Sequence, residues 1–311
     1  MSFASEVKQE VAQKVMQGND ARAELSALVQ LCSSLSLSSH GLSLRISVEN
    51  SAVARRIFSL LKERYEVNLE MFVKKKMNLK KNSIYGIEVY DDVKDILTDL
   101  GIYSSRGLRD TPLKTIVQTD NNARAYLAGC FLASGSVNSP EKTHYHLELS
   151  TNTEEHAQFM IDLLARFYIV GKCIERRNKY VVYVKTAEKI ADFLRIIEAE
   201  QSLFTYEDIR LARDFNNSLR RITNMEVANE MKTQAASKKQ LEDIRILREY
   251  GRVDKLDEKL KEVILLREEF EEASLQELAA IYEERSGNVV SKSGMKHRFN
   301  RIHELAEKIK K

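Results

Sequence analysis

The side chains with the clearest chemistry lie near the C-terminus of the 311-residue chain, in the stretch SKSGMKHRFNRIHELAEKIKK. Apolar residues recur there at helical spacing, at Met295, Phe299, Ile302, Ala306 and Ile309. The rest of the stretch carries donors and acceptors that suit phosphates and base edges in the major groove. We expect the DNA-binding residues to be Lys292, Ser293, Lys296, His297, Arg298, Asn300 and Arg301.

A helix-turn-helix would position these side chains. The stretch LQELAAIYEE predicts a first helix with Ser274 as its N-cap, and RSGNVV predicts the turn. Ser291 is then the N-cap of a second helix, whose first turns would enter the major groove. The turn is longer than in the simplest helix-turn-helix. The alternative is a solvated basic helix at the end of the chain.

Charge is divided unevenly along the chain. The formal net charge is only +3. However, residues 253–284 carry four Lys or Arg against eleven Asp or Glu, whereas residues 287–311 carry seven Lys or Arg against two Glu. A basic cluster of this kind is the usual footprint of a nucleic-acid partner, so we expect double-stranded DNA to bind at the basic end.

Other sequence features exclude several classes of protein. No apolar stretch is long enough to cross a membrane, and the N-terminal residues MSFASEVKQE lack an apolar signal core, so we expect a cytoplasmic protein without a membrane partner. The three cysteines are far apart and form no C-x-x-C motif. This pattern argues against a disulfide framework and a zinc site, and we expect no metal or cofactor.

One order of elements occurs twice in the first two hundred residues. In residues 20–105 and again in 120–200 the pattern predicts helix, strand, helix, strand, strand, helix. We expect Ser51 and Thr153 to cap corresponding helices, and an opening amphipathic helix to place Val7, Val11 and Val15 on one face. Two such halves should pack about a pseudo-twofold axis, which predicts an α+β domain.

The stretch AYLAGCFLASGSVN at residues 125–138 resembles a degenerate LAGLIDADG motif of homing endonucleases. The resemblance implies that this helix packs at the pseudo-twofold axis against its partner, LSALVQLCS at residues 25–33. In that family an acidic residue at each helix end holds the catalytic metal. The corresponding positions here are Ser134 and Cys32, and a further acidic position of the family falls on Leu132, paired with Gln30.

No carboxylate stands at any of these four positions, whereas Mg²⁺ prefers hard oxygen ligands such as carboxylates. We therefore expect no catalytic residues and no enzyme activity. The alternative is a residual metal-dependent DNA endonuclease that uses Glu24 or Glu148 from nearby.

Two basic hairpins and one helix are candidates for secondary DNA contacts through phosphates. Their residues are Lys74, Lys75, Lys76, Lys80, Lys81, Arg176, Arg177, Lys179, Arg220 and Arg221. The alternative for the hairpins is that charged tips are solvated and resist edge-to-edge aggregation. The alternative for the helix is a buried polar junction between domains.

Over essentially the whole chain the sequence resembles the WhiA family. The resemblance rests on SFASEVKQE, on FLASGSV, on a KT-x-x-AA helix and on SKSG-x-x-HR. It implies an α+β fold, with a duplicated LAGLIDADG-like domain at residues 1–205, a helical linker at 206–225 and an all-α helix-turn-helix domain at 226–311. It also implies a bacterial transcription regulator at the nucleoid, linked to cell division, chromosome segregation and, in spore-forming relatives, sporulation.

An alternative assigns the N-terminal domain to protein interaction, with RNA polymerase or another transcription regulator as its partner. The residues do not reveal the operator or the target genes. They also leave open whether the protein activates or represses, and its oligomeric state.

Overall fold

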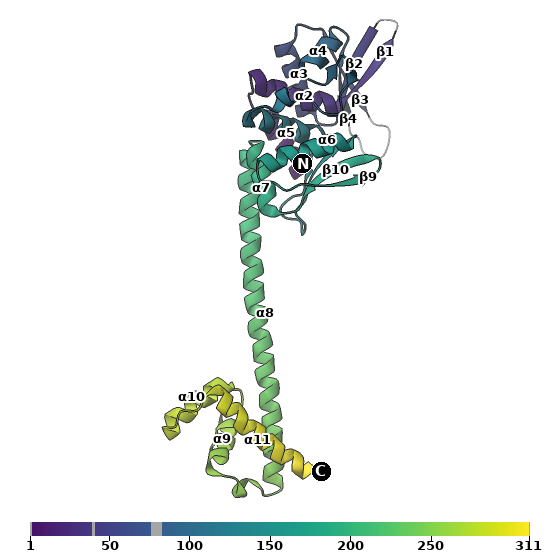
Figure 1. Ribbon diagram of the computed structural model, residues 1–311. Coiled ribbons are helices and arrows are strands. Elements are labelled where there is room, and N and C mark those ends of the chain that lie inside the picture. Colours follow the sequence, from purple (N-terminus) through teal and green to yellow (C-terminus); the bar gives the residue numbers. More distant parts are fainter. Residues whose placement is uncertain (1, 39–40, 76–82, 311) are drawn as a thin grey trace. The chain divides into compact units, whose positions relative to one another are not determined.

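The structure is a computed structural model that describes residues 2–38, 41–75 and 83–310 (Figure 1). The chain forms two compact units, Met1–Arg213 and Asp214–Lys311. The boundary falls inside one helix, α8 (Glu200–Glu249). Residues 206–213, which the sequence assigned to a linker, belong to the first unit. Tyr206 is buried in that unit. The Arg213 guanidinium donates to the backbone oxygens of Pro140 and Thr143, at 2.9 and 3.0 Å.

The first unit contains two similar halves that follow a short opening helix, α1 (Phe3–Val11). The first half consists of α2 (Gly18–Cys32), β1 (Ser33–Ser38), β2 (Gly41–Val48), α3 (Ser51–Arg64), β3 (Leu69–Lys75), β4 (Ser83–Val89) and α4 (Val93–Asp99). A link of β5 (Tyr103–Ser104), β6 (Gly107–Leu108) and the 3₁₀ helix η1 (Lys114–Val117) follows. The second half consists of α5 (Asp120–Ser134), β7 (Ser136–Val137), β8 (Leu147–Thr151), α6 (Glu154–Arg166), β9 (Lys172–Arg176), β10 (Lys179–Val184) and α7 (Ala187–Ile196).

Sheet topology confirms the duplication. The strand order is β1-β2-β4-β3 in one sheet and β7-β8-β10-β9 in the other, with antiparallel pairing throughout. In β2 the expected alternation holds, since Leu44, Ile46 and Val48 are buried. These side chains join α2, α3, α5 and α6 in one apolar core, because each sheet buries one face and leaves the other to solvent.

Several local expectations were wrong. The first strand of each sheet, β1 and β7, was absent from the predicted order of elements: α2 ends at Cys32, and the chain continues as a strand from Ser33. Leucines spaced three and four apart mimic a helix there, although the serine-rich chain pairs as a strand. Val15 is 86% exposed, because α1 ends at Val11. Asn50, not Ser51, caps α3, and its Oδ1 accepts from Ala52 N at 2.8 Å.

Helices α2 and α5 pack against each other through small residues. A Cβ atom added at Gly129 would lie 2.5 Å from the backbone oxygen of Glu24 and 2.8 Å from the Cβ of Ala27. No real side chain tolerates such contacts, so glycine permits this close approach. The Glu24 side chain is itself fully buried, and both of its oxygens accept from Arg56, at 3.0 and 2.6 Å.

A buried polar chain joins α5 to α6. The Tyr126 hydroxyl lies 2.7 Å from His156 Nε2, and the Thr151 hydroxyl lies 2.9 Å from His156 Nδ1. His156 is 2% exposed, and desolvation lowers its pKa to about 4. The folded protein therefore holds this imidazole neutral near pH 7.

We expect His156 to make stability depend on acid pH. Its pKa is lower in the folded chain than the unfolded value of about 6.5, so its contribution is complete above pH 6.5 and is lost as the pH falls towards 4. The contribution amounts to at most about 3 kcal/mol. Denaturant unfolding at pH 7, 5.5 and 4.5 should show a smaller loss for His156→Gln than for the wild type. Equal losses in both proteins would contradict this assignment.

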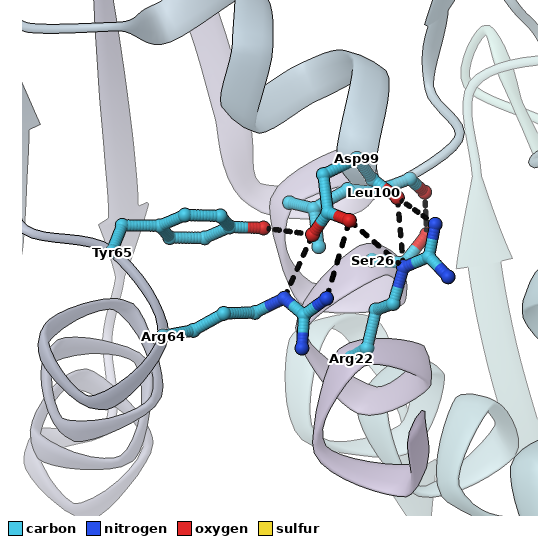
Figure 2. Close-up of polar contacts among 6 residues, drawn as sticks. All are labelled: Arg22, Ser26, Arg64, Tyr65, Asp99 and Leu100. Atoms are coloured by element: carbon cyan, nitrogen blue, oxygen red, sulfur yellow. Dashed lines mark hydrogen bonds and ion pairs between the residues drawn. The ribbon is translucent and has the colours of Figure 1, made fainter. Parts of the chain in front are cut away.

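A second polar network fastens the end of α4 to α2 and α3 (Figure 2). The Asp99 carboxylate accepts from Arg64 Nε and from the Tyr65 hydroxyl, both at 2.7 Å. Burial alone would raise the pKa of Asp99, but these hydrogen bonds outweigh it and lower that pKa. Arg22 donates to the backbone oxygen of Asp99 at 2.8 Å, and Ser26 donates to that of Leu100 at 2.7 Å. All of these groups are thus engaged in holding the fold.

The second unit is helical. After the C-terminal part of α8 it contains the 3₁₀ helix η2 (Val253–Lys255), α9 (Glu258–Glu269), α10 (Leu275–Ser286) and α11 (Lys292–Lys310). Its own core includes Ile244, Val263, Leu278 and Ile302. The buried Arg267 donates from Nη1 to the backbone oxygen of Ala273 at 2.6 Å, which fixes the segment before α10. Among the described helices of both units, none combines the length and apolar character that a membrane span requires.

Candidate nucleic-acid interface

Helices α10 and α11 form the predicted helix-turn-helix. Ser274 and Glu277 make a capping box at the start of α10: the Ser274 side chain accepts from Glu277 N at 3.2 Å, and the Glu277 carboxylate accepts from Ser274 N at 2.7 Å. Gly287 ends α10 with a φ of 66°, in the left-handed region that glycine favours. The Ser291 hydroxyl accepts from Gly294 N at 3.1 Å, which confirms it as the cap of α11.

Packing of α11 leaves one face of the helix in solvent. Met295, Phe299, Ile302 and Ala306 are buried in the core of the second unit, as the spacing predicted. Six of the seven expected contact residues are exposed on the first turns: Lys292, Ser293, Lys296, His297, Asn300 and Arg301. Three cations on the solvent-exposed side of this helix, Lys292, Lys296 and Arg301, suit phosphates and base edges.

Arg298 differs from the other six. Its side chain is half-buried, and its guanidinium lies over the ring of Tyr282, 4.5 Å from the centroid. The Tyr282 hydroxyl donates to Glu262 Oε2 at 2.7 Å, so Arg298 packs on a ring that is itself held in place. This geometry favours a role for Arg298 in fastening α11 to α10.

Arg301 forms an exposed ion pair with Glu304 on the same helix. Its Nη1 donates to Glu304 Oε2 at 2.8 Å, in an i,i+3 pair with both side chains about half exposed. Exposed pairs of this kind are worth at most about 1 kcal/mol. A phosphate or a guanine edge would therefore compete with Glu304 at little cost.

The ends of α2 and α5 carry none of the carboxylates that a nuclease needs. The Ser134 hydroxyl donates to the backbone oxygen of Ser150 at 2.6 Å, and Gln30 donates to that of Asp110 at 2.7 Å. Leu132 is buried. Desolvation raises the pKa of Cys32 to about 12, although Lys8 and Lys179 lower it, so the thiol stays protonated. A donor set of thiol, hydroxyl and amide does not fit Mg²⁺.

The two alternative carboxylates, those of Glu24 and Glu148, interact with other side chains. Glu24 is fully buried and accepts from Arg56 with both oxygens. Glu148 lies on β8, where its Oε2 is 3.2 Å from His146 Nε2. A hollow lies at the ends of α2 and α5, and neither Glu24 nor Glu148 lines it.

The candidates for secondary contacts lie on both units. Lys74 and Lys75 are exposed on β3, and Lys74 sits over the Phe72 ring at 5.0 Å. Lys76, Lys80 and Lys81 lie outside the described residues. Arg176 and Lys179 flank a two-residue turn, Arg177–Asn178, with φ values of 53° and 58°. Arg220 and Arg221 are exposed on α8.

The comparisons with known proteins match the same divisions. Three family models match: the WhiA N-terminal LAGLIDADG-like domain at residues 19–103, the WhiA LAGLIDADG-like domain at 123–216 and the WhiA C-terminal HTH domain at 219–306. A relative from Latilactobacillus sakei subsp. sakei, named "Probable cell division protein WhiA", is 44% identical over 98% of this chain and 97% of its own. The chain belongs to the WhiA family.

Two further WhiA proteins agree with this assignment. A relative from Lysinibacillus sphaericus with the same printed name is 42% identical over all of this chain and 98% of its own. The crystal structure of full-length DUF199/WhiA from Thermatoga maritima has a TM-score of 0.61 and 24% identity, and covers 99% of both chains. These matches confirm the WhiA fold, with two LAGLIDADG-like domains followed by a helix-turn-helix domain.

Proposed function

We propose that this WhiA protein is a DNA-binding transcription regulator that reads duplex DNA with α11. The observation that carries the proposal is the exposed face of that helix. Lys292, Lys296 and Arg301 supply positive charge there, and Asn300 supplies both a donor and an acceptor for an adenine edge. The capped N-terminus of α11 adds backbone donors for a phosphate. The match to a WhiA HTH domain supports the same function.

The names of the relatives support a proposal about the cellular role. Curated relatives are named as probable cell division proteins, so we propose that this protein also acts in cell division. A part in chromosome segregation is proposed from the family resemblance of the sequence alone. A regulator of this kind would act in the cytoplasm, on the nucleoid.

We further propose that the LAGLIDADG-like unit does not cleave DNA. The four positions at the ends of α2 and α5 hold no carboxylate, and Glu24 is neutralised by Arg56. The site therefore lacks the charged oxygen ligands that would hold a divalent metal, and it is the metal that activates water in such an enzyme.

A combined binding and nicking assay tests both statements. With supercoiled plasmid and either Mg²⁺ or Mn²⁺, the full chain should retard the DNA in a gel and leave it uncut. Absence of retardation would contradict DNA binding. Nicking that requires the metal and disappears in Glu24→Gln or Glu148→Gln would contradict catalytic inactivity.

A further inference from the structure

A hollow of about 1070 Å³ lies at the ends of α2 and α5, within the first unit. Its walls include Cys32 and Ser134, the positions at which the nuclease family places its acidic residues. Ser5 and Asn50 bring the N-terminal ends of α1 and α3 to the same hollow. The duplicated fold has therefore kept a concave site at its pseudo-twofold axis, although it has lost the metal ligands.

Three cations from different elements line this hollow. Lys8 comes from α1, Arg55 from α3 and Lys179 from β10. Lys8 and Lys179 both lower the pKa of Cys32, so the two ammonium groups lie near the same thiol. Among the described residues that line the hollow, Glu49 is the one carboxylate. The lining is therefore net positive.

Some described cations of this unit form ion pairs with carboxylates, whereas these three form none with a described residue. In the described part of the chain, Arg22, Arg45, Arg56, Arg64 and Arg166 all form ion pairs with carboxylates. The ion pairs between described residues of this unit include none with Lys8, Arg55 or Lys179. Lys8 is also half-buried and contacts the Phe131 ring, 5.8 Å from its centroid. Burial lowers the pKa of Lys8 to about 8, and the attraction of Glu49 offsets only part of that effect. An anion bound beside Lys8 would stabilise its charged form.

We propose that this hollow binds a phosphate group through Lys8, Arg55 and Lys179. The ammonium of Lys8 would supply, at the ends of the two central helices, the positive charge that a nuclease obtains from a metal. A lysine attracts a phosphate but does not activate water as a divalent metal does, so the site would bind without cleaving. The phosphate could belong to a free phosphate ligand or to the DNA backbone, since both present the same anionic oxygens.

The test uses the full chain and removes two of the cations, in Lys8→Met/Arg55→Gln. A matched control, Lys62→Met/Arg106→Gln, removes the same charges at exposed positions that do not line the hollow. The first readout is the Tm with about 10 mM inorganic phosphate against chloride of equal ionic strength. We expect phosphate to raise the Tm of the wild type and the control by about 3 °C, and that of the double variant by much less. If the double variant does not fold, the same Tm shift is measured on the single variant Arg55→Gln, whose position is exposed.

The second readout is the salt dependence of binding to a duplex of about 20 base pairs. Loss of two phosphate contacts makes the slope of log K against log salt less negative by about 1.8. A reduced phosphate shift identifies a free phosphate ligand, and a reduced slope identifies the DNA backbone. If both readouts are unchanged in the double variant, or if the control changes as much, the proposal is wrong. The phosphate readout involves no DNA, so it stands apart from the role proposed for α11.

Discussion

Replacing Lys296 and Arg301 together with alanine is expected to weaken specific DNA binding by about 100-fold or more. Both side chains are exposed on the first turns of α11, and each has the donors to make a base contact worth about 1–3 kcal/mol. Neither contributes to the core of the second unit, so the variant should melt like the wild type. Fluorescence anisotropy with a duplex selected by the wild-type chain measures the effect.

The same helix offers a matched control. Lys308→Ala/Lys310→Ala removes two exposed positive charges from the far end of α11. It should reduce specific binding only slightly, through the general attraction of positive charge to DNA. If the Lys296 and Arg301 variant keeps its specific affinity, or if the control loses as much, then the first turns of α11 do not read the bases.

Replacing Gly129 with alanine is expected to destabilise the first unit by about 3 kcal/mol. The added methyl group would lie 2.5 Å from a backbone oxygen of α2, so the two central helices must move apart. The gain in helix propensity, about 1 kcal/mol, is too small to offset this clash. Denaturant unfolding followed by circular dichroism measures the change in the free energy of unfolding.

Gly294→Ala is the corresponding control. Gly294 also lies in a helix, but an added Cβ would meet the end of the Val290 side chain at 3.1 Å instead of a backbone atom. Val290 can shift by a few tenths of an ångström, so we expect a change within about 1 kcal/mol. A Gly129→Ala protein as stable as the wild type would show that α2 and α5 do not approach as closely as described.

Local signals predicted much of the fold. Alternation in residues 42–48, the caps at Thr153 and Ser274, and the apolar spacing of α11 each depend on neighbours close in sequence. The repeat predicted two similar halves, and both sheets have the same strand order. These features were recoverable because one short segment contains the whole pattern.

Features that depend on distant contacts were not predicted. Nothing in the sequence near Arg298 shows that its guanidinium packs on Tyr282, from another helix. Lys8 and Arg55 each look like ordinary solvated charges, and only the folded chain brings them to one hollow with Lys179. Cysteine and serine at the helix ends indicate missing metal ligands from residue types alone, and the loss of nuclease activity stays a prediction.

Fluorescence anisotropy of a selected duplex at about 0.15 M salt, comparing the full chain with residues 1–213 and 214–311, tests the central claim most directly. Each fragment keeps one of the two compact units with its own core. We expect residues 214–311 to prefer the selected sequence by at least about 1000-fold over random duplex, and residues 1–213 to show no preference. A sequence preference in residues 1–213 that is missing from 214–311 would contradict the claim that α11 reads the DNA.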